Sequence, residues 1–102
     1  MEWLYQIAQK LHAVTAEGAD RPHDLVDLQL ICGLSSVNLA ATKSICLRLF
    51  DYRRRQSWPP TLTKGDGWDS LYDDAKQGLK VLATCDEAVE WTNALIEEID
   101  NA

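Results

Sequence analysis

Metal-binding and disulfide patterns are missing from this sequence. Its three cysteines, Cys32, Cys46 and Cys85, are odd in number and widely spaced, and none belongs to a Cys-x-x-Cys pair. The two histidines have no second ligand at a zinc spacing, apart from one aspartate four residues after His23. We therefore expect free thiols in a reducing compartment, no metal and no cofactor.

Long apolar runs are missing as well. No stretch approaches the ~20 apolar residues that a membrane-spanning helix needs. The N-terminus also lacks a basic region followed by an apolar run, which a secretory signal would show. Since 46% of the 102 residues are hydrophobic and 25% are charged, the composition suits one globular domain over 1–102. We expect a cytoplasmic protein with no membrane partner.

Basic residues are scarce in the second half of the chain. Residues 1–60 carry 7 basic and 6 acidic side chains, a balance of +1, whereas residues 61–102 carry 3 basic and 10 acidic, a balance of −7. An acidic half repels nucleic acid over most of its surface. Binding to nucleic acid is therefore not expected in general, and any such contact must come from the first half.

Sustained strand alternation is also lacking, and the apolar residues recur at helical spacing. Gly18 and Gly33 predict helix ends, and Ser35 or Ser36 suits the N-cap of the helix that follows. The Pro- and Gly-rich segment 56–67 predicts a loop that Trp58 pins to the core. The fold class is therefore all-α, a small array of about five helices, which we expect over 2–16, 21–32, 36–53, 68–82 and 86–99.

Each expected helix has an apolar stripe that predicts its buried face. Trp3, Ile7 and Leu11 belong to the stripe of the first helix, and Leu71 and Leu79 belong to that of the fourth. The third helix is apolar on two sides, which is typical of a central helix.

Charged residues gather where the first two helices meet. Lys10 lies at the edge of the first stripe, and Asp24 and Asp27 begin the stripe of the second helix. The short connection folds the second helix back beside the first. We expect Lys10 or Arg21 to lie within ion-pair distance of one of the two aspartates, because pairing offsets the loss of hydration. The same residues could instead serve a phosphoryl-transfer site.

One basic and aromatic cluster stands out, formed by Arg53, Arg54, Arg55 and Trp58. Arginine binds phosphate and tryptophan stacks on bases, so these four residues are a possible RNA contact. The alternative is a solvated helix end, where basic residues suit the helix dipole.

In order and spacing, these motifs resemble the C-terminal part of the AbiEii/AbiGii nucleotidyltransferase toxin family. The resemblance covers nearly the whole chain. It rests on Lys10-Leu11-His12-Ala13, Asp24-Leu25-Val26-Asp27-Leu28, Phe50-Asp51-Tyr52-Arg53-Arg54-Arg55, Trp58-Pro59-Pro60, Trp68…Tyr72…Ala75 and Glu87-Ala88-Val89.

The resemblance implies a role for Lys10 in binding nucleotide phosphates and for Asp24 as an active-site acid. Enzymes of the family also carry a Gly-Ser turn and an Asp-x-Asp metal motif on an N-terminal α/β half, and this sequence has neither. We therefore expect a stand-alone or truncated helical domain that is not an enzyme alone. Its expected partners are a separately encoded catalytic half or an antitoxin, or a second copy in a homodimer.

The alternative function is a small helical protein-interaction module. An exposed apolar patch on the first two helices would favour the split enzyme, because it would mark the place of the missing half. A fully polar surface would favour the independent module.

Overall fold

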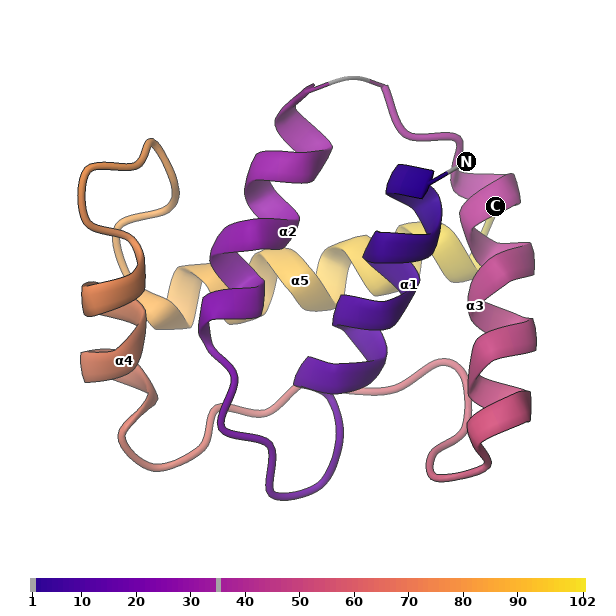
Figure 1. The fold of residues 1–102 in the computed structure, drawn as a ribbon, viewed down its shortest axis with the longest axis horizontal. Coiled ribbons are helices and arrows are strands. Elements are labelled where there is room, and N and C mark those ends of the chain that lie inside the picture. The colour runs from indigo at the N-terminus through magenta and orange to yellow at the C-terminus, as the bar shows by residue number, and fades with distance from the viewer. Residues whose placement is uncertain (1, 35) are drawn as a thin grey trace.

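The computed structural model describes residues 2–34 and 36–102, and those residues form five helices without a strand (Figure 1). The predicted all-α class is confirmed. No helix in the described part of the chain is long and apolar enough to cross a membrane. In chain order the helices are α1 (Glu2–Val14), α2 (His23–Leu34), α3 (Leu39–Arg53), α4 (Trp68–Ala75) and α5 (Cys85–Asp100).

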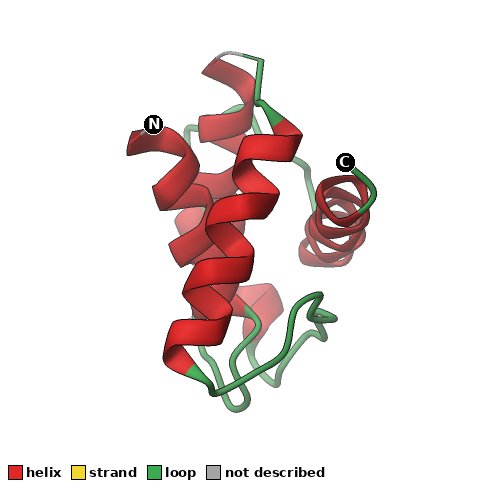
Figure 2. Cartoon of the chain, turned by 90° about the vertical axis from the view of Figure 1, so that its right-hand side faces the viewer, coloured by secondary structure: helices red, strands yellow, loops and turns green. Residues whose placement is uncertain are grey.

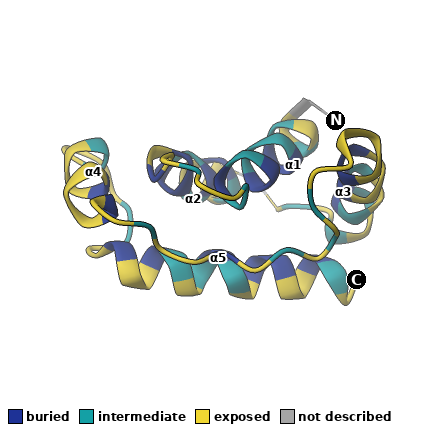
Figure 3. Ribbon diagram, turned by 90° about the horizontal axis from the view of Figure 1, so that it is seen from below, coloured by how far each residue is buried: buried dark blue, intermediate teal, exposed yellow. Residues whose placement is uncertain are grey.

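The helices are arranged in two layers. Seen from below, α4, α2, α1 and α3 lie side by side, and α5 crosses one face of that layer (Figure 3). After a turn of 90° about the vertical axis from the view of Figure 1, α5 is seen end-on beside the other helices (Figure 2). The shortest dimension of the molecule, 21 Å, matches two helices of about 10 Å each. Among the described helices, none covers the opposite face of the layer.

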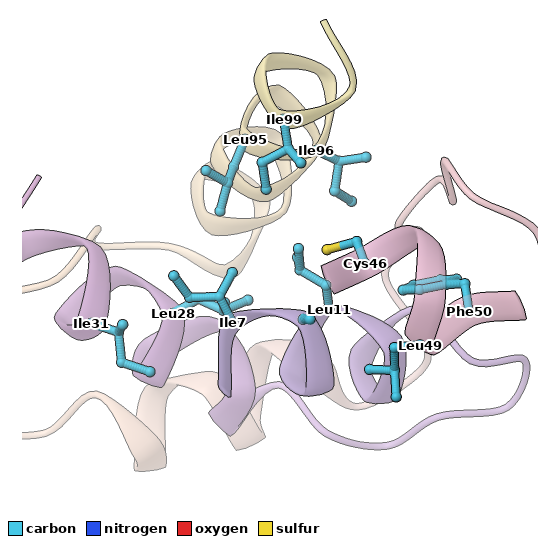
Figure 4. Close-up of a cluster of buried hydrophobic side chains, with 11 residues drawn as sticks. Ile7, Leu11, Leu28, Ile31, Cys46, Leu49, Phe50, Leu95, Ile96 and Ile99 are labelled. Atoms are coloured by element: carbon cyan, nitrogen blue, oxygen red, sulfur yellow. The ribbon is translucent and has the colours of Figure 1, made fainter. Parts of the chain in front are cut away.

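The larger apolar core lies between the layer and α5. Ile7 and Leu11 of α1 and Leu28 of α2 point toward Ile96 and Ile99 of α5 (Figure 4). These five side chains are at most 3% exposed. The apolar faces predicted for the first, second and fifth helices therefore meet in one core.

Cys46 of α3 completes that core and is fully buried. Burial raises the pKa of its thiol to about 12, so it packs as a neutral apolar group. Burial likewise raises the pKa of Cys85, to about 11. All three cysteines are free thiols, as the sequence predicts.

A second core lies at the other end of the molecule, between α2, α4 and the start of α5. Trp68 and Tyr72 of α4 pack there against Leu25 of α2 and Ala88 of α5. Leu62, from the loop between α3 and α4, closes this core. The short α4 is therefore held in the fold by the aromatic side chains on its own inward face.

The third helix begins later than predicted. Its N-cap is Asn38, whose side-chain oxygen accepts from the Ala41 N–H at 3.0 Å. Ser36 precedes the helix in irregular backbone, and Ser35 lies outside the described residues. Asparagine is as good an N-cap as serine, so composition alone did not select the right residue. The predicted stop at Gly33 was also wrong, because α2 continues to Leu34.

The fourth helix is shorter than the predicted 68–82. It ends at Ala75, and Gly78 then adopts a left-handed conformation with φ of 75°. A turn of this kind favours glycine, which has no Cβ to clash. Leu79, just after this turn, is 45% exposed, and Leu71, within α4, is 41% exposed, although both were predicted to be buried.

Smaller corrections concern the other helices. The first ends at Val14 rather than residue 16, and Trp3, predicted to be buried, is 52% exposed. The fifth begins at Cys85, one residue earlier than predicted, because Thr84 and Glu87 form a capping box.

Candidate functional site

The predicted charged cluster forms at the junction of α1 and α2. Lys10 Nζ lies 2.9 Å from Asp27 Oδ2 and 3.4 Å from Asp24 Oδ1. Arg21 Nε lies 2.7 Å from Asp24 Oδ2, on the other side of the same carboxylate. The expected ion pairing between the first two helices is therefore confirmed.

Local structure explains the placement of these groups. Pro22 is buried just before α2, and the amide of Leu25 donates to its carbonyl at 3.0 Å. The amide of Asp24 donates to the Arg21 carbonyl, also at 3.0 Å. Arg21 and Asp24 therefore sit one tight turn apart, and the carboxylate is in the first turn of α2, where a negative charge is favoured by the helix dipole.

Burial differs across the cluster. The Asp24 side chain is fully enclosed, the Lys10 side chain is 24% exposed and the Asp27 side chain is 42% exposed. Burial alone would lower the pKa of Lys10. The hydrogen bond to Asp27 and the charges of both aspartates outweigh it, so this pKa is raised. Lys10 is therefore charged, and part of its side chain remains exposed to an anion from solvent.

The carboxylates of this cluster belong to no group of side chains with the composition of a metal site. No group of three or more histidine, cysteine, aspartate or glutamate side chains converges anywhere in the residues described. Asp24 already accepts from Lys10 and Arg21, and His23 Nε2 lies 3.6 Å from it. As it stands, the cluster joins two helices and presents one ammonium group at its edge.

The predicted basic and aromatic residues divide into two sets. Arg53 turns toward α1, where its Nη1 lies 3.4 Å from His12 Nδ1. Arg54, Arg55 and Trp58 instead line one cavity of about 410 Å³ at the end of α3. The structure therefore brings three of the four predicted residues together and separates Arg53 from them.

Trp58 pins the loop after α3, as predicted. Its ring packs edge-on against Phe50 with centroids 5.3 Å apart. Its Nε1 donates to Asp100 Oδ1 of α5 at 3.0 Å. The residue thereby links the end of α3 to the end of α5.

His12, weighed above only as a metal ligand, is a buried ring between Phe50 and Arg53. Its Nε2 is enclosed and has no hydrogen-bond partner. Burial, followed by the charges of Arg53 and Arg55, lowers the pKa of this imidazole. The ring is therefore neutral at pH 7. The helical spacing of residues around His12 in the sequence gave no sign of the arginines that lie beside it in the structure.

Sequence reasoning missed a polar network that fixes α4. Gln29 Nε2 donates to the Tyr72 hydroxyl at 3.0 Å, and this hydroxyl donates to the Leu82 carbonyl at 2.7 Å. The Leu82 amide donates to Gln29 Oε1 at 2.8 Å. These residues are 10 to 53 positions apart, so no local pattern reveals the network.

An exposed aromatic groove between α1 and α3 was also missed. Tyr5, Ile45, Arg48, Leu49 and Tyr52 line a surface hollow of about 540 Å³. Tyr52 is 85% exposed. In the sequence, the only sign of this groove was that the third helix is apolar on two sides.

No protein-family model matches this chain, and no curated protein resembles it at a significant level. A functional proposal therefore depends on the side chains of this protein and on the resemblance of its motifs described above.

Proposed function

We propose that this chain is a helical domain that acts by binding a protein partner and transfers no nucleotide alone. By the resemblance described above, the partner is a polypeptide that carries the α/β half of an AbiEii/AbiGii-type nucleotidyltransferase. The observation that carries the proposal is the apolar surface left exposed on α1 and α2.

That surface lies on the two helices that also carry the charged cluster. Trp3, in the first turn of α1, is 52% exposed, and Leu34, at the end of α2, is 69% exposed. Because α1 and α2 are antiparallel, the first turn of α1 and the last turn of α2 lie at the same end of the molecule (Figure 1). Exposed large apolar side chains mark interaction surfaces when they gather, so a partner that binds at this end would bury apolar area.

The charged cluster fits the same proposal. Lys10 is exposed enough to meet a phosphate that a partner presents, and Asp27 is the more accessible of its two carboxylate neighbours. Asp24 is fully enclosed. We therefore give Asp24 a positioning role, in which it holds Lys10 and Arg21, rather than direct contact with a nucleotide.

The second candidate is a protein-interaction module without any link to nucleotide transfer. The aromatic groove between α1 and α3 favours it, because tyrosine and arginine dominate the energetics of many protein interfaces. An acidic amphipathic helix would suit this groove, since Arg48 lies on its wall and Tyr5 and Tyr52 flank it.

The test is reconstitution. The tagged chain captures its partner from native extract, and the two purified proteins are mixed with magnesium and labelled nucleoside triphosphates. We expect the chain alone to incorporate no label, and the mixture to incorporate label that Lys10→Ala abolishes. Lys80→Ala, a change at an exposed lysine outside the helices, is the matched control and should have no effect.

A second pair of variants tests the surface. Leu34→Glu should prevent capture of the partner, whereas Leu79→Glu, at an exposed leucine after α4, should not. Incorporation by the chain alone that disappears in Asp24→Ala would overturn the proposal. A captured partner without Gly-Ser and Asp-x-Asp motifs would refute the split enzyme and leave the interaction module.

A further inference from the structure

The cavity at the end of α3 combines the two surfaces that a nucleotide requires. Its lining combines polar residues with apolar and aromatic ones: Asp51, Arg54, Arg55, Gln56 and Ser57, together with Leu47, Phe50 and Trp58. Its volume of about 410 Å³ falls within the roughly 300–1,000 Å³ typical of small-molecule sites.

The walls of the cavity are held from three helices. Arg54 ends α3 in the left-handed conformation, and its amide donates to the Phe50 carbonyl at 3.0 Å. Gln56 donates through Nε2 to the His12 carbonyl of α1 at 2.7 Å. Trp58 is tied to Asp100 of α5. The cavity is therefore formed by the fold itself, before any ligand arrives.

The two arginines of the cavity have no acidic partner. Within residues 2–34 and 36–102, every ion pair involves other side chains, and both guanidinium groups belong to exposed residues. This contrasts with Lys10, Arg21 and Lys64, which are all paired with aspartates. Unpaired guanidinium groups that line the same cavity are suited to phosphate oxygens.

From these observations we infer that the cavity binds a nucleoside phosphate, either as a free nucleotide or as the end of an RNA strand. The phosphate lies against Arg54 and Arg55, and the base lies against the ring of Trp58. Asp51 of α3 lies on the same cavity wall, where its carboxylate can accept hydrogen bonds from ribose hydroxyls. An inorganic phosphate would use only the first of these three contacts.

This site is separate from the proposed partner surface on α1 and α2, and binding is measured with the chain alone. The experiment is a calorimetric titration at low salt with AMP, adenosine, inorganic phosphate and a short single-stranded oligoadenylate. We expect AMP to bind at least about tenfold more tightly than adenosine or phosphate, because only AMP makes both contacts.

The decisive variant is the double change Arg54→Gln and Arg55→Gln. It should weaken AMP binding by at least about tenfold, since two charged contacts to phosphate are lost. The double change Lys76→Gln and Lys80→Gln is the matched control, because it removes the same number of charges after α4, outside the cavity, and it should bind AMP as the unaltered chain does. Trp58→Leu should reduce the preference for AMP over phosphate. Circular dichroism checks that each variant is folded.

The titration with the oligoadenylate distinguishes a free nucleotide from the end of an RNA strand. If the strand binds more tightly than AMP, the ligand is RNA. If the two bind equally, the ligand is the free nucleotide. Either result supports the site. The inference is overturned if neither ligand binds at millimolar concentration, if the double variant binds AMP as the unaltered chain does, or if phosphate binds as tightly as AMP.

Discussion

Two regions of this molecule that contain basic side chains differ in how their charges are used. At the junction of α1 and α2, Lys10 and Arg21 are paired with Asp24 and Asp27 at 2.7 to 3.4 Å. At the end of α3, Arg54 and Arg55 line a cavity, and no ion pair of the described residues includes either of them. The first region is closed by its own carboxylates, and the second remains open to an anion.

The difference shows how the same type of residue takes two roles. A carboxylate that is fully enclosed must be paired, so its partners are committed to the fold. An exposed guanidinium group stays hydrated and contributes little to stability, which leaves it available to a ligand. Mutations should therefore affect stability in the first region and binding in the second.

The largest effect is expected for Asp24→Ala. This change leaves the charges of Lys10 and Arg21 without their shared partner and opens a gap beneath α2. We expect the free energy of unfolding to fall by about 3 kcal/mol, measured by urea denaturation. Asp20→Ala, at an exposed position in the same connection, is the matched control and should change it by less than about 0.5 kcal/mol. Equal effects of the two changes would show that the cluster does not stabilise the fold.

A smaller effect on stability is expected from the buried imidazole ring of His12. Because burial and the nearby arginines lower the pKa of His12 in the folded protein, the unfolded chain binds a proton more readily. Stability should therefore fall as the pH drops below about 6.5, the ordinary pKa of histidine. In His12→Phe this part of the pH dependence should disappear, whereas His23→Phe, which alters an exposed histidine, should retain it. Identical pH profiles for the unaltered chain and His12→Phe would contradict this assignment.

Much of the fold could be predicted because it depends on local periodicity. The apolar stripes of α1, α2 and α5 follow helical spacing, and they meet in one core. The errors in the predicted helix ends and buried faces came from tertiary contacts and turn chemistry. The left-handed Gly78 ends α4 early, and Asn38 rather than a serine caps α3. Trp3, in the first turn of α1, is exposed although it belongs to the apolar stripe of that helix.

The candidate sites were predictable to different degrees. A short connection between two helices was enough to predict that Lys10 or Arg21 pairs with Asp24 or Asp27, because it leaves few ways to pack the helices. The cavity at the end of α3 was visible in the sequence only as a basic and aromatic cluster. Its shape depends on contacts from Gln56 to α1 and from Trp58 to α5, which join residues more than 40 positions apart.

The comparison between the two regions is tested most directly by a pair of double-mutant cycles on the free energy of unfolding. One cycle combines Lys10→Met with Asp27→Asn, and the other combines Arg55→Gln with Asp51→Asn, an acid and a base that line the same cavity without pairing. We expect a coupling energy of about 0.5–1 kcal/mol in the first cycle and less than about 0.3 kcal/mol in the second. Equal coupling energies, or a larger value for Arg55 and Asp51, would contradict the distinction between a closed and an open charged region.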